Sequence, residues 1–323
     1  MATVTRKKSS APPREKPPRK KVAKKVKAKV SYTDDSISLP TDLNEVSDDL
    51  FDFVICLYGE KGVGKTSLAS QFDDALVCMF ERGRRNLKIK QVPKPGEPEL
   101  DWERFKEYVA MFLKSNLRTL VIDTIDECYM QCFHHVCGEN RVTHPENHKS
   151  GYKIWDEIAA EFAGLLNLIH ESGKCLVLIS HCKSRVLPSP ASKKGLARIN
   201  SDDESADKSE RLEPTCKPAA FRFIQQICDF VFYYGYKDGE RAITVRSPHN
   251  VYWTSGGVED RYLDPEGNPV ECFLIGNSPK KAFQSLLDGF NNKLYDVDYV
   301  PTKKSKTEDL PRKKTVKKKA RRS

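Results

Sequence analysis

The chain lacks the features that mark membrane-spanning, secreted and GTP-binding proteins. No apolar run in its 323 residues approaches the roughly 18 that a membrane-spanning helix needs, and the first residues lack the apolar segment of a secretory signal. The guanine-reading motif N-K-x-D is absent, and no D-x-x-G spacing follows Asp123. We therefore expect a protein of the cytoplasm (the host cytoplasm if it is viral) that is not secreted, has no membrane partner and is no GTPase switch.

Large apolar residues are also scarce at both ends of the chain, where the positive charge is concentrated. Residues 1–30 carry twelve Lys and Arg against one Glu, and residues 302–323 carry eleven against two acids, so the net charge of +10 hides an acidic middle of −10. Such segments cannot bury enough apolar surface to offset the entropy of ordering, so we expect a disordered basic arm over 1–35 and a disordered basic tail over 301–323. Runs of this kind bind nucleic-acid phosphates without reading sequence. Solubilising tails or an import signal are the alternatives.

The ten cysteines are spread through expected strands and helices, which favours reduced thiols over a disulfide framework. One stretch with the spacing C-x₃-C-x-H-H-x-C raises the question of zinc: Cys128, Cys132, His134, His135 and Cys137, with His144 and His148 further on. The spacing matches no common zinc pattern, and most of these residues fall in an expected helix. Buried helical cysteines with exposed histidines are the interpretation we prefer.

The segment Gly59–Thr66 (GEKGVGKT) is a complete G-x-x-x-x-G-K-[ST] phosphate-binding loop. An apolar strand precedes it and a helix follows, which is the context such a loop requires. Glycines let the backbone wrap a phosphate chain, and the N–H groups at the helix start point at the anion. We expect Lys65 to reach the β- and γ-phosphates and Thr66 to hold Mg²⁺. The expected nucleotide-binding residues are Gly59, Glu60, Lys61, Gly62, Val63, Gly64, Lys65, Thr66 and Ser67.

Strands and helices alternate along the rest of the chain. Strands are expected at about 52–58, 75–80, 119–122, 175–179, 229–236 and 241–246, and helices at about 65–72, 101–115, 126–136, 152–171 and 219–226. This alternation predicts an α/β fold in which a mostly parallel sheet is flanked by helices on both faces. We expect one domain over 36–300, with the strand 75–80 beside the P-loop strand and the last two strands paired.

A polar stretch interrupts the alternation between Lys183 and Lys217. It contains Pro188, Pro190 and Gly195 together with a Ser/Asp/Glu cluster, and it has almost no apolar residues. Structureless stretches of this length inside a compact domain are unusual and generally functional. We expect residues 183–217 to form a mobile loop.

A nucleotide site that hydrolyses its ligand needs acids for the metal and for the attacking water. Thr119–Asp123 (TLVID) is an apolar strand ending in Asp, the Walker B pattern, so Asp123 is expected to hold Mg²⁺ directly or through a water. An Asp that caps the next helix is the alternative. Glu81, at the end of the strand 75–80, and Glu127, on the first turn after Asp123, compete for the role of the base.

The order of these elements resembles a known family. The P-loop, Phe80–Gly83 (FERG), TLVID-T and Leu178–His181 (LISH) are similar to RecA-type ATPase cores. More narrowly, they resemble the short phage-encoded RecA-like proteins of the single-strand annealing and recombination type, over about residues 50–270. The resemblance implies ATP and Mg²⁺ as cofactors and Lys65, Glu81 and His181 as catalytic residues, with Glu81 the general base and His181 the sensor of the γ-phosphate. A core histidine that is hydrogen-bonded at a strand end is the alternative for His181.

The same resemblance implies a mobile DNA-contacting loop over 183–217. Its candidate phosphate contacts are Lys183, Arg185, Lys193, Lys194 and Arg198, although the acidic run 202–204 would oppose a phosphate backbone. Lys217 and Arg222 are candidates for a cation inserted into a neighbouring subunit's site, since a homo-oligomer is implied.

We therefore expect an ATPase that acts on single-stranded DNA in recombination, annealing or repair, with a single-strand-binding or replication protein as a further partner. Two alternatives stay open. A nucleotide kinase would use the same loop with 183–217 as its lid, and an ATP-gated adaptor or helicase loader would bind ATP without depending on hydrolysis.

Overall fold

The computed structural model describes residues 46–81, 87–187, 209–247, 252–256, 258 and 260–294. The basic arm expected over 1–35 and the tail expected over 301–323 lie outside these ranges. Within them, no helix combines the length and the apolar character that crossing a membrane would require.

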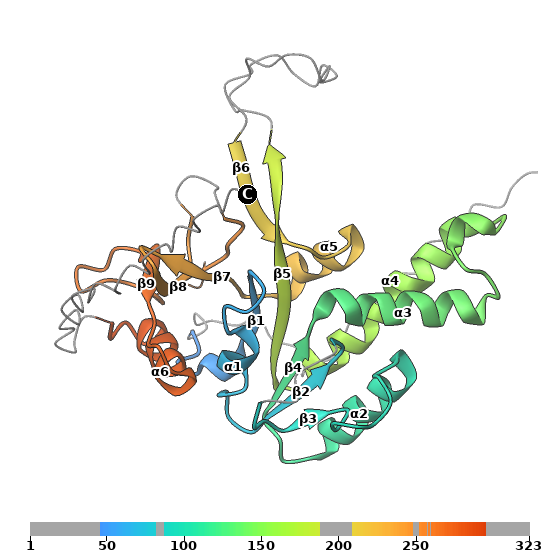
Figure 1. Ribbon diagram of the computed structural model, residues 1–323, viewed down its shortest axis with the longest axis horizontal. Coiled ribbons are helices and arrows are strands. Elements are labelled where there is room, and N and C mark those ends of the chain that lie inside the picture. Colours follow the sequence, from blue (N-terminus) through green and yellow to red (C-terminus); the bar gives the residue numbers. More distant parts are fainter. Residues whose placement is uncertain are drawn as a thin grey trace, which may run out of the picture. The chain divides into compact units, whose positions relative to one another are not determined.

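A mostly parallel sheet forms the centre of the fold (Figure 1). Its strands lie in the order β3-β2-β4-β5-β1-β7-β8-β9, and β6 pairs with the far part of β5. Neighbours from β3 to β7 run parallel, whereas β8 pairs antiparallel with both β7 and β9. The bounds are β1 Val54–Gly59, β2 Ala75–Met79, β3 Gln91–Val92, β4 Thr119–Asp123, β5 Cys175–Leu187, β6 Ser209–Pro214, β7 Phe230–Lys237, β8 Glu240–Thr244 and β9 Cys272–Leu274.

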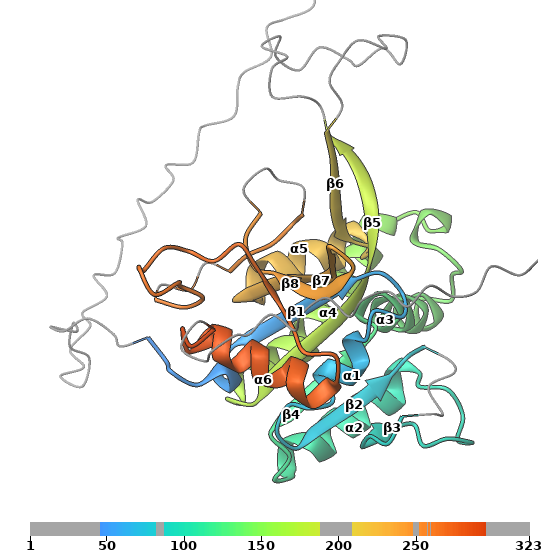
Figure 2. The same cartoon turned by 60° about the vertical axis from the view of Figure 1, so that its left-hand side comes forward.

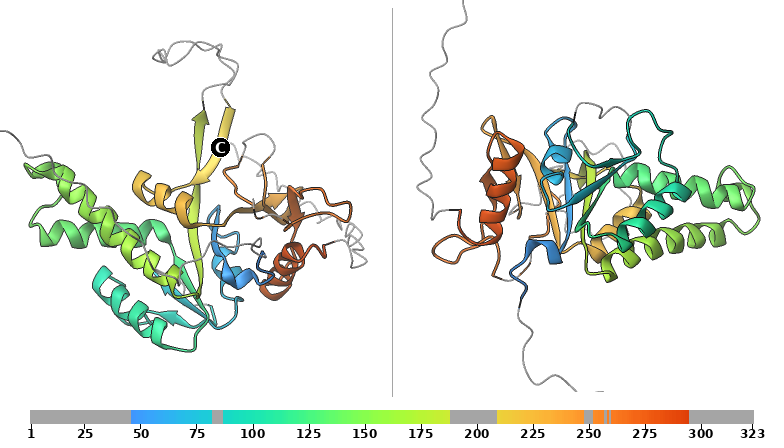
Figure 3. Two further views of the ribbon diagram at one scale, coloured as in Figure 1. Left: turned by 180° about the vertical axis from the view of Figure 1, so that it is seen from behind. Right: turned by 90° about the horizontal axis from the view of Figure 1, so that it is seen from below.

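Helices cover both faces of the sheet, as Figure 3 shows from below. Apolar side chains of α2, α3, α4 and α5 pack on one face, and those of α1 and α6 pack on the other. The bounds are α1 Lys65–Ala69, α2 Trp102–Lys114, α3 Ile125–Glu139, α4 Gly151–Glu171, α5 Pro218–Ile227 and α6 Pro279–Phe290, with short 3₁₀ turns η1 Leu50–Asp52 and η2 Pro145–Asn147. The expected α/β fold with a mostly parallel, helix-flanked sheet is confirmed.

The P-loop strand β1 is apolar throughout because both of its faces are buried. Cys56 and Tyr58 belong to the core on the face of α2 to α5, whereas Ile55 and Leu57 belong to the core beside α1 and α6. Successive side chains of a strand point to opposite faces, so a strand with both faces covered needs apolar residues at every position.

One expected neighbour relationship is wrong. The strand that ends before Glu81, β2, does not lie beside the P-loop strand β1, because β4 and β5 stand between them. Strand order in a parallel sheet is set by how the crossover helices pack, which a local apolar run does not reveal. The late strands β7 and β8 do pair, as expected.

The expectation of one mobile loop over 183–217 is also wrong at both ends. Strand β5 does not stop at residue 179 but continues to Leu187, and β6 pairs antiparallel with this extension. The two strands form a ribbon that projects beyond the sheet (Figure 2). Paired strands satisfy their own backbone groups, so a two-stranded ribbon does not need an apolar sequence. Residues 188–208, with Lys193, Lys194 and Arg198, lie outside the described residues.

Candidate active site

The carboxyl ends of the central parallel strands gather the expected site residues at one edge of the sheet. Gly59 at the end of β1 stands in register with His181 on β5. Asp123 at the end of β4 stands in register with Ile179 on one side and with Met79 of β2 on the other. Ligands of open α/β sheets bind at this edge.

The P-loop wraps around the ammonium group of its own lysine. The buried Lys65 donates hydrogen bonds from Nζ to the carbonyl oxygens of Gly59, at 2.8 Å, and Glu60, at 2.9 Å. Gly64 has φ of 113° directly before α1, in the left-handed region that favours glycine. The loop therefore holds a cation and the first N–H groups of α1 together, the arrangement that binds phosphate.

Tyr234 of β7 packs against this loop and was not foreseen from the sequence. A Cβ atom on Gly59 would lie 2.0 Å from the Tyr234 carbonyl oxygen, so only glycine fits there. A Cβ atom on Gly64 would lie 3.3 Å from the Tyr234 hydroxyl. The two glycines thus allow β7 to approach the loop closely, and they also allow the loop backbone to wrap around a phosphate.

Thr66 and Asp123 meet at the centre of the site. The Thr66 hydroxyl donates to Oδ2 of Asp123 over 2.6 Å, and both residues are fully buried. A hydroxyl and a carboxylate are oxygen ligands of the kind that Mg²⁺ prefers. The two side chains therefore fit the metal role expected of them.

Glu81 and His181 form the second polar pair. Nε2 of His181 lies 2.5 Å from Oε1 of Glu81, and the backbone N–H of Phe80 donates to the carbonyl oxygen of Asp123 over 2.8 Å. Both side chains keep some exposure, so a ligand can reach them. Glu127, the competing base, has an exposed side chain on the first turn of α3. This geometry favours Glu81 as the base.

A polar clamp connects the site to the end of the ribbon. The Thr215 hydroxyl donates to Oδ1 of Asp126 over 2.7 Å, and the Thr215 N–H donates to the His181 carbonyl oxygen over 3.0 Å. The clamp joins α3, β5 and the chain leaving β6. Asp126 and Thr215 are 89 residues apart, so no local signal could have identified them.

Two of the expected DNA contacts lie on one face of the ribbon, opposite a buried acid. Lys183 and Arg185 of β5 approach the carboxylate of Glu213 on β6 to 3.7 and 3.5 Å, and Arg211 approaches it to 3.4 Å. Glu213 is buried, whereas the Lys183 and Arg185 side chains are largely exposed. Three cations share one carboxylate, so this face keeps a positive excess.

The remaining candidates lie elsewhere. Lys217, directly before α5, and Arg222, in the middle of α5, line a pocket shared with α3 and α4. Cys128, Cys132 and Cys137 are buried core residues of α3, and burial raises the pKa of each thiol. Within the described ranges no three metal-binding side chains come together.

A pocket of about 230 Å³ opens beside the P-loop. It is lined by Gly64 and Ser67 of the loop and helix start, Tyr234 of β7, Arg241 of β8, and Ser278 before α6, among others. It is the space next to the phosphate-binding residues that a nucleoside could enter.

A family model described as an AAA domain, AAA_24, matches residues 52–255. The chain is 25% identical over 145 residues to the SPbeta prophage-derived uncharacterized protein YorG of Bacillus subtilis (strain 168), a stretch covering 42% of this chain and 44% of the relative. The match thus spans less than half of that relative's length. A similar solved structure is the KaiC-like protein PH0186 of Pyrococcus horikoshii OT3, with a TM-score of 0.35 and 15% identity over 72% of this chain and 88% of that chain.

Proposed function

We propose that this chain, which belongs to the AAA_24 family of AAA domains, hydrolyses ATP, as its P-loop ATPase family suggests. We further propose, from the structure of its ribbon, that it does so in order to act on single-stranded DNA in recombination, annealing or repair. The observation that carries the proposal is the continuity of β5. The strand bears His181 against Glu81 at the site and then, without a break, Lys183 and Arg185 on the projecting ribbon.

Each polar group at the strand edge has a part in hydrolysis. Glu81 accepts a proton from the attacking water and orients it, which is the work of a general base. Lys65 and the N–H groups of the P-loop hold the phosphates. Thr66 and Asp123 would hold Mg²⁺, which when bound offsets the charge that develops on the β- and γ-phosphates. The pocket between the P-loop, Tyr234 and α6 is our candidate for the nucleoside.

His181 is our candidate for the residue that couples the nucleotide site to DNA. A γ-phosphate bound beside Glu81 would compete with the Glu81 carboxylate for the hydrogen bond to His181. The resulting shift of His181 would then move β5, the strand that carries it. The exposed cations Lys183 and Arg185 lie two and four residues further on, where they can neutralise phosphates. Bound DNA and bound nucleotide would thus contact two parts of one continuous strand.

The test is an ATPase assay with and without single-stranded DNA, repeated across a range of salt concentrations. We expect turnover that DNA stimulates at low salt, with the stimulation fading as salt screens the phosphate contacts. Lys65→Ala is the control for contaminating activity and should abolish turnover. Turnover that is independent of DNA at every salt concentration would contradict the DNA part of the proposal. The part that proposes ATP hydrolysis would still stand. Full biological function of Glu81→Gln would favour an ATP-gated adaptor.

A further inference from the structure

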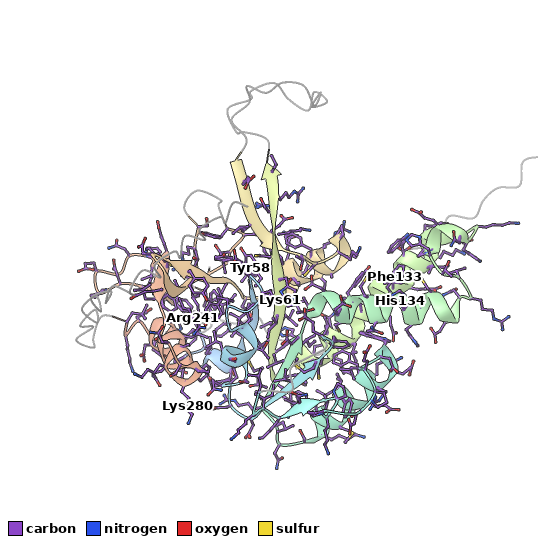
Figure 4. The ribbon with its side chains drawn as sticks, viewed as in Figure 1. Tyr58, Lys61, Phe133, His134, Arg241 and Lys280 are labelled. Atoms are coloured by element: carbon purple, nitrogen blue, oxygen red, sulfur yellow. The ribbon has the colours of Figure 1, made fainter. Side chains whose placement is uncertain are left out.

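We propose that the pocket between α3, α4 and α5 binds one nucleotide of a single nucleic-acid strand, with its base on Trp155 and its phosphate on Lys217 and Arg222. This site is separate from the P-loop. In Figure 4 the pocket residue Phe133 lies on α3, well apart from Lys61 of the P-loop. The pocket measures about 470 Å³, within the range of about 300 to 1,000 Å³ that small-molecule sites occupy.

One side of the pocket is a cluster of three aromatic rings. The ring centroids of Phe133, His144 and Trp155 lie 5.5 to 5.6 Å from one another. Phe133 is 7% exposed and anchors the cluster in the core, whereas Trp155 is 39% exposed. A large ring that is held from behind and open in front is a stacking surface for a planar ligand, because little side-chain freedom remains to be lost on binding.

The other side of the pocket is positively charged. Lys217 and Arg222 are both exposed, and Lys217 stands at the N-terminus of α5 with no side chain capping the helix. The described residues that line the pocket include no carboxylate. A ligand that fits therefore has a flat aromatic part and a negative charge, which are the base and the phosphate of a nucleotide.

The position of the pocket favours a strand over a free mononucleotide. Lys217 follows the last residue of β6, Pro214, by three residues, so the pocket lies next in the chain after the cationic ribbon. A single strand that contacts Lys183 and Arg185 can continue from the ribbon toward the α5 end. In this respect the inference rests on the proposed function, which makes single-stranded DNA the substrate.

The test is binding of a fluorescently labelled oligo-dT to the full chain, measured by anisotropy at several salt concentrations. Trp155→Ala should weaken binding about 5- to 100-fold, because stacking of a base on an aromatic ring is lost. Trp155→Phe keeps a ring and should lose less. The double variant Lys217→Ala/Arg222→Ala should reduce the slope of log K against log salt by about 0.7, since one phosphate contact on a single strand contributes about that much.

Matched controls lie on the same helix. Tyr152 is exposed one turn before Trp155 and Lys153 is also exposed, and neither lines the pocket. Tyr152→Ala and Lys153→Ala should bind as the wild type does. Trp155→Ala loses ring contacts, so its thermal midpoint should fall by a few degrees, but it should still unfold cooperatively and keep the wild-type ATP turnover without DNA, which shows that the variant is folded.

Three outcomes would overturn the proposal, and they differ in whether the proposed function is also contradicted. If the wild-type chain binds DNA and the pocket variants bind it equally well, the pocket site is wrong and the proposed function stands. If, in addition, an acidic peptide with an aromatic residue binds the wild type but not Trp155→Ala, the pocket belongs to a protein partner. If the wild-type chain binds no single strand at any salt concentration, the DNA part of the proposed function fails with it.

Discussion

The Nε2 atom of His181 lies 2.5 Å from Oε1 of Glu81, so that β5 and the chain after β2 are joined across the end of β4. This hydrogen bond puts the candidate base, Glu81, in direct contact with the candidate sensor, His181. Asp123 lies at the end of the strand between them and holds the hydroxyl of Thr66. The residues proposed to bind metal, activate water and sense the nucleotide are therefore linked by hydrogen bonds, including the one from the Phe80 N–H to the Asp123 carbonyl oxygen.

The first prediction concerns Glu81 as the base. Glu81→Gln keeps the size and the hydrogen-bonding capacity of the side chain but cannot take a proton, so turnover should fall by about 10²- to 10⁴-fold while ATP binding persists. Single-turnover hydrolysis and equilibrium nucleotide binding measure the two quantities separately. Glu127→Gln is the matched control and should keep turnover near the wild-type value. A larger loss in Glu127→Gln than in Glu81→Gln would assign the base to Glu127.

The second prediction concerns His181 as the coupling residue. His181→Asn should leave ATP hydrolysis without DNA measurable but remove its stimulation by single-stranded DNA, because the contact between Glu81 and the ribbon strand is lost. The ratio of turnover with and without DNA is the readout. Ser184→Ala, on the same strand and exposed, should keep the wild-type ratio. An unchanged ratio in His181→Asn would show that β5 does not transmit the signal.

The third prediction concerns the pair Thr66 and Asp123. Thr66→Val keeps the shape of the side chain and removes the hydroxyl that donates to the buried carboxylate. The free energy of unfolding should fall by about 1.5 to 3 kcal/mol, the usual value for a hydrogen bond to a charged group. The Mg²⁺ dependence of nucleotide binding should also weaken. Thr66→Ser retains the hydroxyl and should restore both properties, and its failure to do so would point to the methyl group instead.

Local motifs made the centre of the site predictable. The P-loop and the strand ending in Asp123 could be found because their chemistry lies within a few consecutive residues. Glu81 is a candidate base from its place at a strand end, the resemblance to RecA-type cores ranks it above Glu127 and adds His181, and the structure brings Glu81 and His181 together. Helix α6 also carried a signal that was overlooked: Ser278 and Pro279 at its start and apolar residues at 282, 286 and 290, which are buried against the core beside α1.

Other parts could not be predicted, because they depend on contacts between distant segments. Tyr234 touches the P-loop only because β7 pairs with β1, and Asp126 meets Thr215 across 89 residues. The sequence predicts a loop where the ribbon lies, because Lys183 and Arg185 interrupt the apolar pattern of β5 beyond residue 181. Their partner Glu213 comes from β6, almost thirty residues later, and only the pairing shows that they form a strand.

The fourth prediction concerns the charge of the ribbon. Glu213→Gln removes the carboxylate that faces Lys183, Arg185 and Arg211 and leaves these cations for DNA phosphates. Binding of single-stranded DNA should tighten, and its salt dependence should become steeper, because more counterions are released. Glu210→Gln, on the same strand, is the matched control. Weaker binding in Glu213→Gln would mean that the carboxylate holds the cations in their binding geometry.

The last prediction concerns the buried thiols. Burial raises the pKa of Cys175, on β5, to about 12, so the folded chain keeps this proton at a pH where the unfolded chain loses it. Above the unfolded pKa of about 8.5 the unfolded state binds fewer protons, and stability must fall as the pH rises toward the folded pKa. Cys175 contributes about 1.4 kcal/mol per pH unit to this decline.

Urea unfolding at pH 7.5, 9 and 10 measures the decline, and Cys175→Ser supplies the comparison. Serine does not titrate in this range and keeps a donor for the Phe53 carbonyl oxygen, which the thiol faces at 3.9 Å. At pH 7.5 the thiol is protonated in both the folded and the unfolded state, so the difference in unfolding free energy between variant and wild type at that pH measures the loss of packing alone. Between pH 9 and 10 its stability should then fall less steeply than that of the wild type. Parallel curves would show that Cys175 ionises in the folded chain as readily as in the unfolded one, and that this end of β5 is open to solvent.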